Sequence, residues 1–149
     1  MPTTSERFLV QPGKKLRLAD VDPRGTPGFD GDKDAGKTRK AELNARLEEL
    51  QETLYASGTH RLLVVLQAMD AGGKDGTIRS VFDGVNPQGV RVTSFKAPST
   101  LEQAHDFLWR CQVALPRRGE IGIFNRSHYE EVLAVRVHPD FLAGQGIDP

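Results

Sequence analysis

The chain has 149 residues, which is enough for one domain with its own hydrophobic core. Lys plus Arg and Asp plus Glu both number 20, and this zero net charge argues against a nucleic-acid coat or a membrane-surface protein. The single cysteine, Cys111, excludes an intrachain disulfide, and no apolar run has the length of a signal peptide core or a membrane span, so we expect a soluble, cytoplasmic protein.

Residues 1–36 predict an irregular N-terminal arm, because they are rich in Pro, Gly, Asp and Lys and show no sustained periodicity. From Lys37 to about Ser57, leucines recur at helical spacing, which predicts an amphipathic helix packed on the domain. A short coiled coil is the alternative, but two heptads are too few to favour it. The leucines of this stripe are Leu43, Leu47, Leu50 and Leu54.

Three segments predict strands, at Leu62–Leu66, Val90–Phe95 and Ile121–Phe124. The first run is apolar at every position, as expected of a parallel strand that helices cover on both faces.

A helix is predicted after each of these strands. The first runs to about Asp83, the second begins near Thr100 and ends before Pro116, and the third runs from Ser127 to about Val137.

Two serine–glutamate pairs predict where the last two helices begin. Ser99 precedes Glu102 and Ser127 precedes Glu130, each by the three residues of a capping box.

The alternation of helix and strand predicts the α/β class, with right-handed crossovers and a parallel sheet. Three strands make a narrow sheet with an open edge, and the Gly-rich tail Gly144–Pro149 adds no further element. We therefore expect the chain to be part of a domain.

The sequence contains two candidate phosphate-binding loops. Gly31–Thr38 (GDKDAGKT) matches the pattern G-x-x-x-x-G-K-[ST] in full, whereas Ala68–Asp75 (AMDAGGKD) departs from it at its first and last positions. Such a loop needs a buried strand before it, so that the N–H groups of the turn converge on phosphate at a helix N-terminus. Asp22–Gly28, which precedes the full match, is too rich in Pro and Gly for a central strand. We expect Gly31–Thr38 to be a surface loop that opens a helix.

The second candidate has the required context. Leu62–Leu66 precedes it, Gly72 and Gly73 permit close approach of the backbone, and a helix follows at once. The ammonium group of Lys74 supplies a point charge for phosphate oxygens. A Gly-rich turn without any ligand is the alternative. The residues predicted to bind phosphate are Ala71, Gly72, Gly73, Lys74, Asp75, Gly76 and Thr77.

Four segments in order resemble the polyphosphate kinase 2 family: VLQAMDAGGKDGTI, SFKAPS, HDFLWR and FNRSHYEEVLAVRVHP. Together they span about Leu62–Pro139. The resemblance implies a three-layer α/β/α P-loop kinase fold of the thymidylate-kinase type. It also implies Mg²⁺-dependent transfer of a phosphoryl group between inorganic polyphosphate and a nucleoside mono- or diphosphate. The FNRSHYE form resembles the branch of the family that accepts AMP, ADP or both.

The resemblance assigns roles to individual residues. Asp70, Lys74 and Arg126 are the implied catalytic residues, with Asp70 assisting the metal ion or activating the accepting phosphate. Asn125 stands where some relatives have Asp, and a neutral amide is no charged ligand. Metal ligation therefore falls to Asp70, with two further candidates, Glu130 and Glu131.

The acceptor nucleotide is expected near Lys96, Arg110 and Asn125. Lys96 follows a strand end, which is a favoured ligand position in open α/β sheets, although a solvated charge is an equal alternative for Lys96 and Arg110. Trp109 shares its helix with apolar neighbours and is expected in the core rather than stacked on a base.

Relatives of this family continue with an arginine-bearing lid and further strands, so residues 37–149 are expected to be a partial P-loop kinase domain. We expect polyphosphate and AMP, ADP or ATP as partners, no nucleic acid or membrane, and a homo-oligomer in the full-length form. Two other functions stay open: an ordinary ATP-dependent nucleotide kinase, and a non-catalytic subunit that binds phosphate or nucleotide.

Overall fold

The computed structural model describes residues 6, 8–135, 137–138 and 141. The predicted tail Gly144–Pro149 lies outside these residues. The chain divides into two compact units, Met1–Glu42 and Leu43–Pro149.

The first unit contains a short 3-10 helix, η1 (Leu18–Asp20), and the start of the long helix α2 (Lys33–Ser57). The side chain of Asp32 caps α2, because its Oδ1 accepts the backbone N–H groups of Asp34 and Ala35 at 3.1 and 2.8 Å. The helix therefore begins four residues before the predicted start at Lys37, and most of the full phosphate-loop match is helical.

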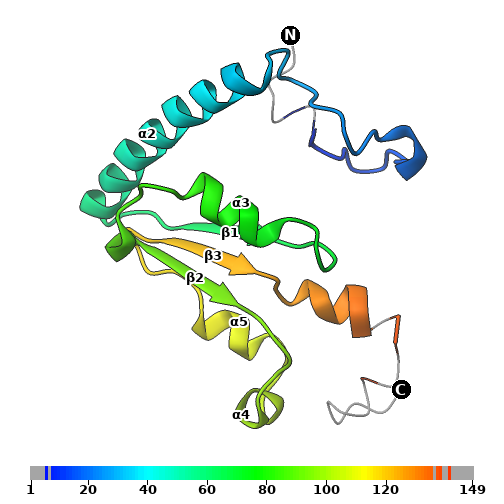
Figure 1. Ribbon diagram of the computed structural model, residues 1–149. Coiled ribbons are helices and arrows are strands. Elements are labelled where there is room, and N and C mark those ends of the chain that lie inside the picture. Colours follow the sequence, from blue (N-terminus) through cyan, green and yellow to red (C-terminus); the bar gives the residue numbers. More distant parts are fainter. Residues whose placement is uncertain (1–5, 7, 136, 139–140, 142–149) are drawn as a thin grey trace. The chain divides into compact units, whose positions relative to one another are not determined.

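The second unit is built on three parallel strands, β1 (Leu62–Leu66), β2 (Val90–Ser94) and β3 (Ile121–Asn125), in the spatial order β1-β3-β2 (Figure 1). The predicted strands are confirmed to within one residue at each end. The expected burial of Leu62–Leu66 on both faces is wrong, because β1 is an edge strand in which Leu62 and Leu63 are exposed. The register places Leu66, Ser94 and Asn125 level at the carboxyl ends. Polar residues that follow the three strands therefore meet at one edge of the sheet.

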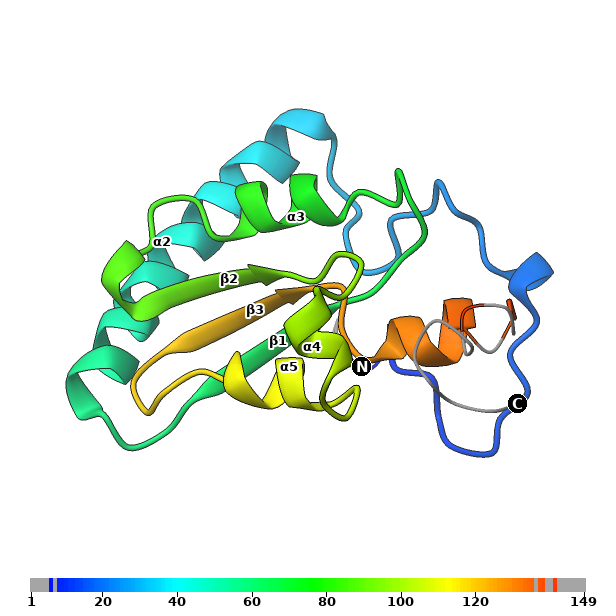
Figure 2. The same cartoon turned by 90° about the horizontal axis from the view of Figure 1, so that it is seen from below.

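Helices cover both faces of this sheet, which confirms the predicted three-layer α/β/α architecture (Figures 1 and 2). Helix α3 (Lys74–Val81) lies on one face, and helices α4 (Thr100–Gln103) and α5 (Trp109–Val113) lie on the other. The rings of Phe95 and Phe124 meet edge to face at 4.8 Å in the core.

The packed face of α2 differs from the predicted leucine stripe, since Leu43 and Leu50 are about half exposed. Gln51 is buried and accepts the N–H of Asn86 at 3.2 Å. A Cβ on Gly89 would lie 2.1 Å from the Gln51 amide nitrogen, so the backbone approaches α2 closely there. The packed face therefore combines Gln51 with two of the four predicted leucines, Leu47 and Leu54, which are half-buried.

The predicted helix between Thr100 and Pro116 is wrong in one respect, because it is broken into α4 and α5. Asp106 accepts the N–H of Leu108 on its side chain at 2.9 Å and the N–H of Trp109 on its carbonyl at 2.8 Å. These local bonds start a new helix in place of continuing the old one.

One of the two predicted capping boxes forms. The Ser99 hydroxyl accepts the N–H of Glu102, and the Glu102 carboxylate accepts the N–H of Ser99, which lowers the pKa of Glu102. After β3, the chain forms instead a π-helical turn, η3 (Glu131–Val135). The predicted box there is wrong, because the carboxylate of Glu130 accepts from side chains across the site.

None of the helices in the described part of the chain combines the length and the apolar character that a membrane crossing requires.

Candidate phosphate-binding site

The turn between β1 and α3 is tight enough to require glycine. A Cβ on Gly72 would lie 2.8 Å from the Ala68 Cβ and 2.9 Å from the Met69 carbonyl oxygen. Gly73 has a φ of 82°, and Ala71 is held at a φ of 60°, which is uncommon for a residue with a side chain. The backbone of this loop is therefore shaped by its glycines and held under strain.

The N-terminus of α3 is left open by this turn. Gly73 is its N-cap and offers no side chain to cap the first amides, and the N–H of Thr77 is the one that returns to the Gly73 carbonyl, at 2.9 Å. The uncapped amides of Lys74, Asp75 and Gly76 carry the positive end of the helix dipole, which favours an anion.

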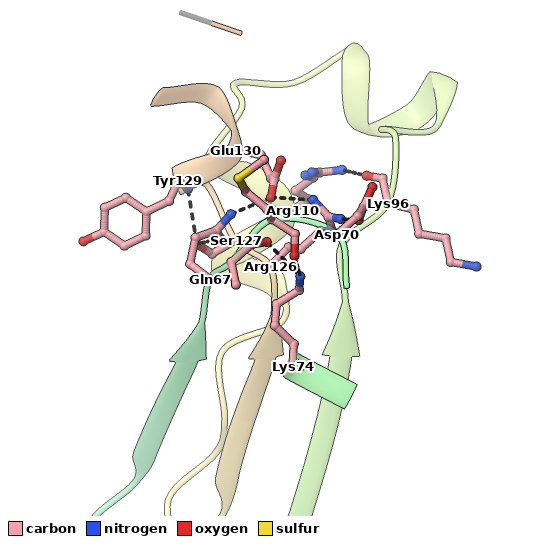
Figure 3. Close-up of polar contacts among 11 residues, drawn as sticks. Gln67, Asp70, Lys74, Lys96, Arg110, Arg126, Ser127, Tyr129 and Glu130 are labelled. Carbon is pink, nitrogen blue, oxygen red and sulfur yellow. Dashed lines mark hydrogen bonds and ion pairs between the residues drawn. The ribbon is translucent and has the colours of Figure 1, made fainter. Parts of the chain in front are cut away.

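Lys74 folds back on its own loop. Its ammonium donates to the carbonyl oxygens of Ala68 at 2.7 Å and of Met69 at 3.0 Å (Figure 3). Phosphate oxygens carry charge and make stronger acceptors for an ammonium than neutral carbonyls do. The lysine is thus held beside the open helix end by bonds that a phosphate can replace.

A pocket of about 410 Å³ lies beyond the carboxyl ends of the strands. It brings together nearly every residue that the sequence predicted for phosphate binding, with the exception of Thr77, which lies further along α3. The residues that line it are Asp70, Ala71, Gly72, Gly73, Lys74, Asp75, Gly76, Ser94, Phe95, Lys96, Asn125 and Arg126.

Arg126 is constrained in the pocket through both its backbone and its side chain. Its φ is 67°, and its N–H donates to the Leu66 carbonyl at 3.0 Å, so its backbone is fixed between β1 and β3. The guanidinium pairs with Asp70 on one side and with Glu130, at 2.8 Å, on the other (Figure 3). The hydrogen bond that Arg126 donates to the Glu130 carboxylate is the main cause that raises the pKa of Arg126.

Asn125 and Asp75 form a contact that sequence analysis missed. The Asn125 amide donates to the Asp75 carboxylate at 2.6 Å. Asp75 stands where the full pattern has Ser or Thr, and Asn125 stands at the carboxyl end of β3. A carboxylate on the helix and an amide on the strand therefore face each other across the pocket.

Lys96 lines the loop pocket, whereas Arg110 lines only the two hollows that adjoin it. The Arg110 guanidinium is buried, donates to the Lys96 carbonyl at 2.8 Å and lies 5.2 Å from the Phe95 ring centre. A second hollow of about 330 Å³ shares Lys96 and Arg126 with the loop pocket. A third, of about 180 Å³, shares Arg110 with the second and reaches α4. The three hollows follow one another from the phosphate loop to α4.

Trp109, expected in the core, is half-buried and stacks on His105, with 4.1 Å between the ring centres. It is not among the residues that line the three hollows.

A network beneath Arg126 was missed by sequence analysis. The Gln67 amide donates to the same carboxylate oxygen of Glu130 that Arg126 uses, and the Ser127 hydroxyl donates to the Gln67 carbonyl oxygen at 3.4 Å. Two signals pointed to it: Glu130 follows Arg126 by four residues, and Gln67 is the first polar residue after β1.

The side chains of the loop pocket supply some, but not all, of the oxygen ligands that a hard cation needs. Among the described residues, no three His, Cys, Asp or Glu side chains come together as a metal cluster. Asp70, Asp75 and Asn125 line the same pocket, and Mg²⁺ is commonly held by one or two carboxylates together with substrate phosphates and water. The donors present therefore fit Mg²⁺ that arrives with a phosphate ligand.

Several known proteins are similar to this chain in sequence and in fold. The chain is 60% identical over 132 residues to an AMP/ADP-polyphosphate phosphotransferase of Meiothermus ruber, covering 89% of this chain and 49% of that protein. It is 47% identical over 147 residues to an ADP-polyphosphate phosphotransferase of Rhodopseudomonas palustris, covering 99% and 50%. The crystal structure of polyphosphate kinase 2 from Arthrobacter aurescens superposes with a TM-score of 0.86 at 45% identity, covering 97% of this chain and 53% of that one.

The chain thus spans about half the length of these relatives. The family model described as polyphosphate kinase 2 matches residues 30–146. This range includes the phosphate loop, the three strands of the sheet and Arg126. With the loop geometry and the shared fold, this match shows that the chain belongs to the polyphosphate kinase 2 family.

Proposed function

We propose that the protein transfers a phosphoryl group between inorganic polyphosphate and a nucleoside mono- or diphosphate, with AMP and ADP as the acceptors. The observation that carries the proposal is the uncapped N-terminus of α3, with the Lys74 ammonium beside it, at the carboxyl end of the parallel strand β1. The names of the relatives from Meiothermus ruber and Rhodopseudomonas palustris support polyphosphate as the phosphate partner.

Positioning and neutralisation of charge account for the chemistry. Phosphoryl transfer places charge on the equatorial oxygens of the moving group, and a kinase site stabilises that charge with fixed donors. Lys74, the open amides of α3 and Arg126 surround the pocket where the group would sit. These groups hold donor and acceptor in line, and the protein forms no covalent bond with either.

The acceptor nucleotide would extend from the loop pocket along the adjoining hollows. Arg110 is already fixed by Lys96 and Phe95, so its guanidinium offers a preorganised charge between the second and third hollows. Lys96 and Asn125 face the loop pocket. We assign these three residues to the phosphates and sugar of AMP or ADP.

Mg²⁺ is part of the proposal as the ion that accompanies the phosphates. Asp70 and Asp75 would hold it together with phosphate oxygens, and the ion would neutralise charge on the donor and acceptor. Both carboxylates line the loop pocket. Asp70 is exposed and paired with Arg126, whereas Asp75 accepts a hydrogen bond from Asn125.

Donor competition tests the proposal. The chain is incubated with ADP and Mg²⁺, and ATP formation is followed with polyphosphate as the donor; AMP phosphorylation is then compared with polyphosphate and with ATP as donor. We expect turnover with polyphosphate in both assays. Turnover with ATP alone would identify an ordinary nucleotide kinase. Binding of tripolyphosphate without turnover would identify a binding role and contradict the proposed activity of this chain.

A further inference from the structure

We infer that Glu130 is a positioning residue, which holds the guanidinium of Arg126 toward the phosphate pocket. The inference rests on the proposed function, because it concerns how Arg126 meets a phosphate chain. Glu130 lines the second hollow but not the loop pocket, which it reaches through its bond with Arg126. Toward the loop pocket, its role is therefore to aim another side chain.

The two carboxylates that flank Arg126 differ in exposure. The Asp70 side chain is 91% exposed, whereas those of Glu130 and Arg126 are 23% and 28% exposed. Solvent weakens an exposed ion pair, and a partly buried pair is screened much less. Glu130 is thus the stronger anchor, and Asp70 is the partner that a polyphosphate chain can displace.

Glu130 is itself fixed by residues from two other segments. Gln67 follows β1 and donates to the carboxylate, while Ser127 is fully buried and orients Gln67 with its hydroxyl (Figure 3). The backbone of Arg126 is anchored as well, through its bond to Leu66. A long side chain loses its rotamer freedom when it binds a ligand, and these contacts remove that freedom before the ligand arrives.

The arrangement predicts a division of roles on binding. The phosphate chain replaces Asp70 at the outer side of the guanidinium, while Glu130 keeps its bond at the inner side. The network of Gln67, Ser127 and Glu130 stays the same in both states. Loss of Glu130 leaves Arg126 charged and present but no longer aimed.

A double-mutant cycle on the full chain tests the inference, with tripolyphosphate affinity measured by calorimetry. We expect Glu130→Ala and Arg126→Ala each to weaken binding about 10-fold, or ~1.4 kcal/mol. The double variant should bind no more weakly than Arg126→Ala alone, because both changes remove one function. Glu130→Gln should recover most of the affinity, since its amide oxygen still accepts the bond from Arg126.

Two further measurements keep the test decisive. Glu49→Ala removes an exposed Arg–Glu pair on α2, with Arg46, and should leave affinity unchanged. NMR signals of the arginine guanidinium N–H groups, with the Arg126 signal identified by its loss in Arg126→Lys, report its orientation without any ligand. We expect a resolved signal in the wild type and a collapsed one in Glu130→Ala. If Glu130→Ala fails to fold, Gln67→Ala takes its place, with an expected loss of about 3-fold.

Each outcome bears on one proposal. Additive losses in the cycle, or an unchanged Arg126 signal in Glu130→Ala, would overturn the positioning role. If the wild type binds no tripolyphosphate, the proposed function fails, while the guanidinium spectra still decide whether Glu130 holds Arg126.

Discussion

Two glycine-rich stretches of this chain, Gly31–Thr38 and Ala68–Thr77, carry the residues of a phosphate loop, and only the poorer match has the geometry. The first matches the pattern in full but forms the exposed first turns of α2. The second has an alanine and an aspartate out of pattern, yet it joins β1 to α3 and lines the pocket. The chain before the loop therefore matters more than the residues within it.

The two helix starts explain the difference. The first amides of α2 are already satisfied by the Asp32 carboxylate, and Lys37 pairs with Asp34 at 2.7 Å. The first amides of α3 have no side-chain cap, and Lys74 binds neutral carbonyls. A helix end that is capped by its own acid repels a second anion, whereas an uncapped end attracts one.

The largest expected effect comes from removing one lysine at a time. Lys74→Ala should weaken tripolyphosphate binding roughly 100-fold, because it removes a charged donor worth ~2–3 kcal/mol. Lys37→Ala should change affinity by less than roughly 2-fold, since its ammonium belongs to an exposed pair. Calorimetry on both variants measures the contrast. Equal losses, or a loss at Lys37 alone, would show that the phosphate site is the other loop.

The strands and the phosphate loop were predictable because each depends on a local signal. The continuous apolar run Leu62–Leu66 predicts a strand, although not the exposure of Leu62 and Leu63 at the edge of the sheet, and Gly72–Gly73 after it predicts the turn. The start of α2 was placed too late because the capping role of Asp32 was missed. The break at Asp106 was missed because a short polar side chain inside a helical pattern competes with the helix through its own bonds.

The next largest effect is expected when one glycine of each stretch, Gly72 or Gly36, is replaced by alanine. Gly72→Ala places a Cβ against Ala68 and Met69, which should cost about 2 kcal/mol of overpacking and weaken tripolyphosphate binding about 30-fold. Gly36→Ala lies inside α2, and the nearest atom to its new Cβ is the Phe29 ring edge at 3.4 Å. This change should stabilise the helix by about 0.8 kcal/mol.

Calorimetry and thermal unfolding separate the two effects. Normal phosphate affinity in Gly72→Ala would mean that the tight turn is unnecessary for binding. A loss of affinity in Gly36→Ala would restore Gly31–Thr38 as a candidate.

The site depended more than the strands on contacts between distant segments. Arg126, Asp70 and Lys74 were predicted as neighbours through the family resemblance, and the structure brings them to one pocket. The partner of Asp75 was not predicted, because Asn125 lies 50 residues away in the chain and no local pattern joins them. Glu130 was assigned to a capping box because it follows Ser127 by three residues. It also follows Arg126 by four residues, which fits an ion pair equally well.

A smaller effect is expected at Asp75, the last position of the phosphate-loop pattern, when its partner Asn125 is changed. Asn125→Asp places two carboxylates where an amide now donates to Asp75, and should destabilise the fold by about 1 kcal/mol, because the bond is lost and the charges repel. Mg²⁺ should restore most of the melting temperature by lying between the two acids. In α2, Thr38 donates to the Asp34 carbonyl at 3.2 Å, and Thr38→Ala should show no response to Mg²⁺. A melting temperature of Asn125→Asp that ignores Mg²⁺ would argue against a cation in the pocket.

The cap of α2 gives the smallest effect and the most direct test of the physical contrast. Asp32→Ala frees the amides of Asp34 and Ala35, and should cost about 0.5 kcal/mol of helix stability, because this helix start is exposed to water. Circular dichroism measures the lost helix. Tripolyphosphate binding should stay that of the wild type, since an open helix end alone lacks the preceding strand of the sheet and the strained turn that aim the amides of α3. If Asp32→Ala gained a second phosphate site comparable to the first, the open helix end would be sufficient by itself, and β1 would not be the element that makes Ala68–Thr77 the phosphate loop.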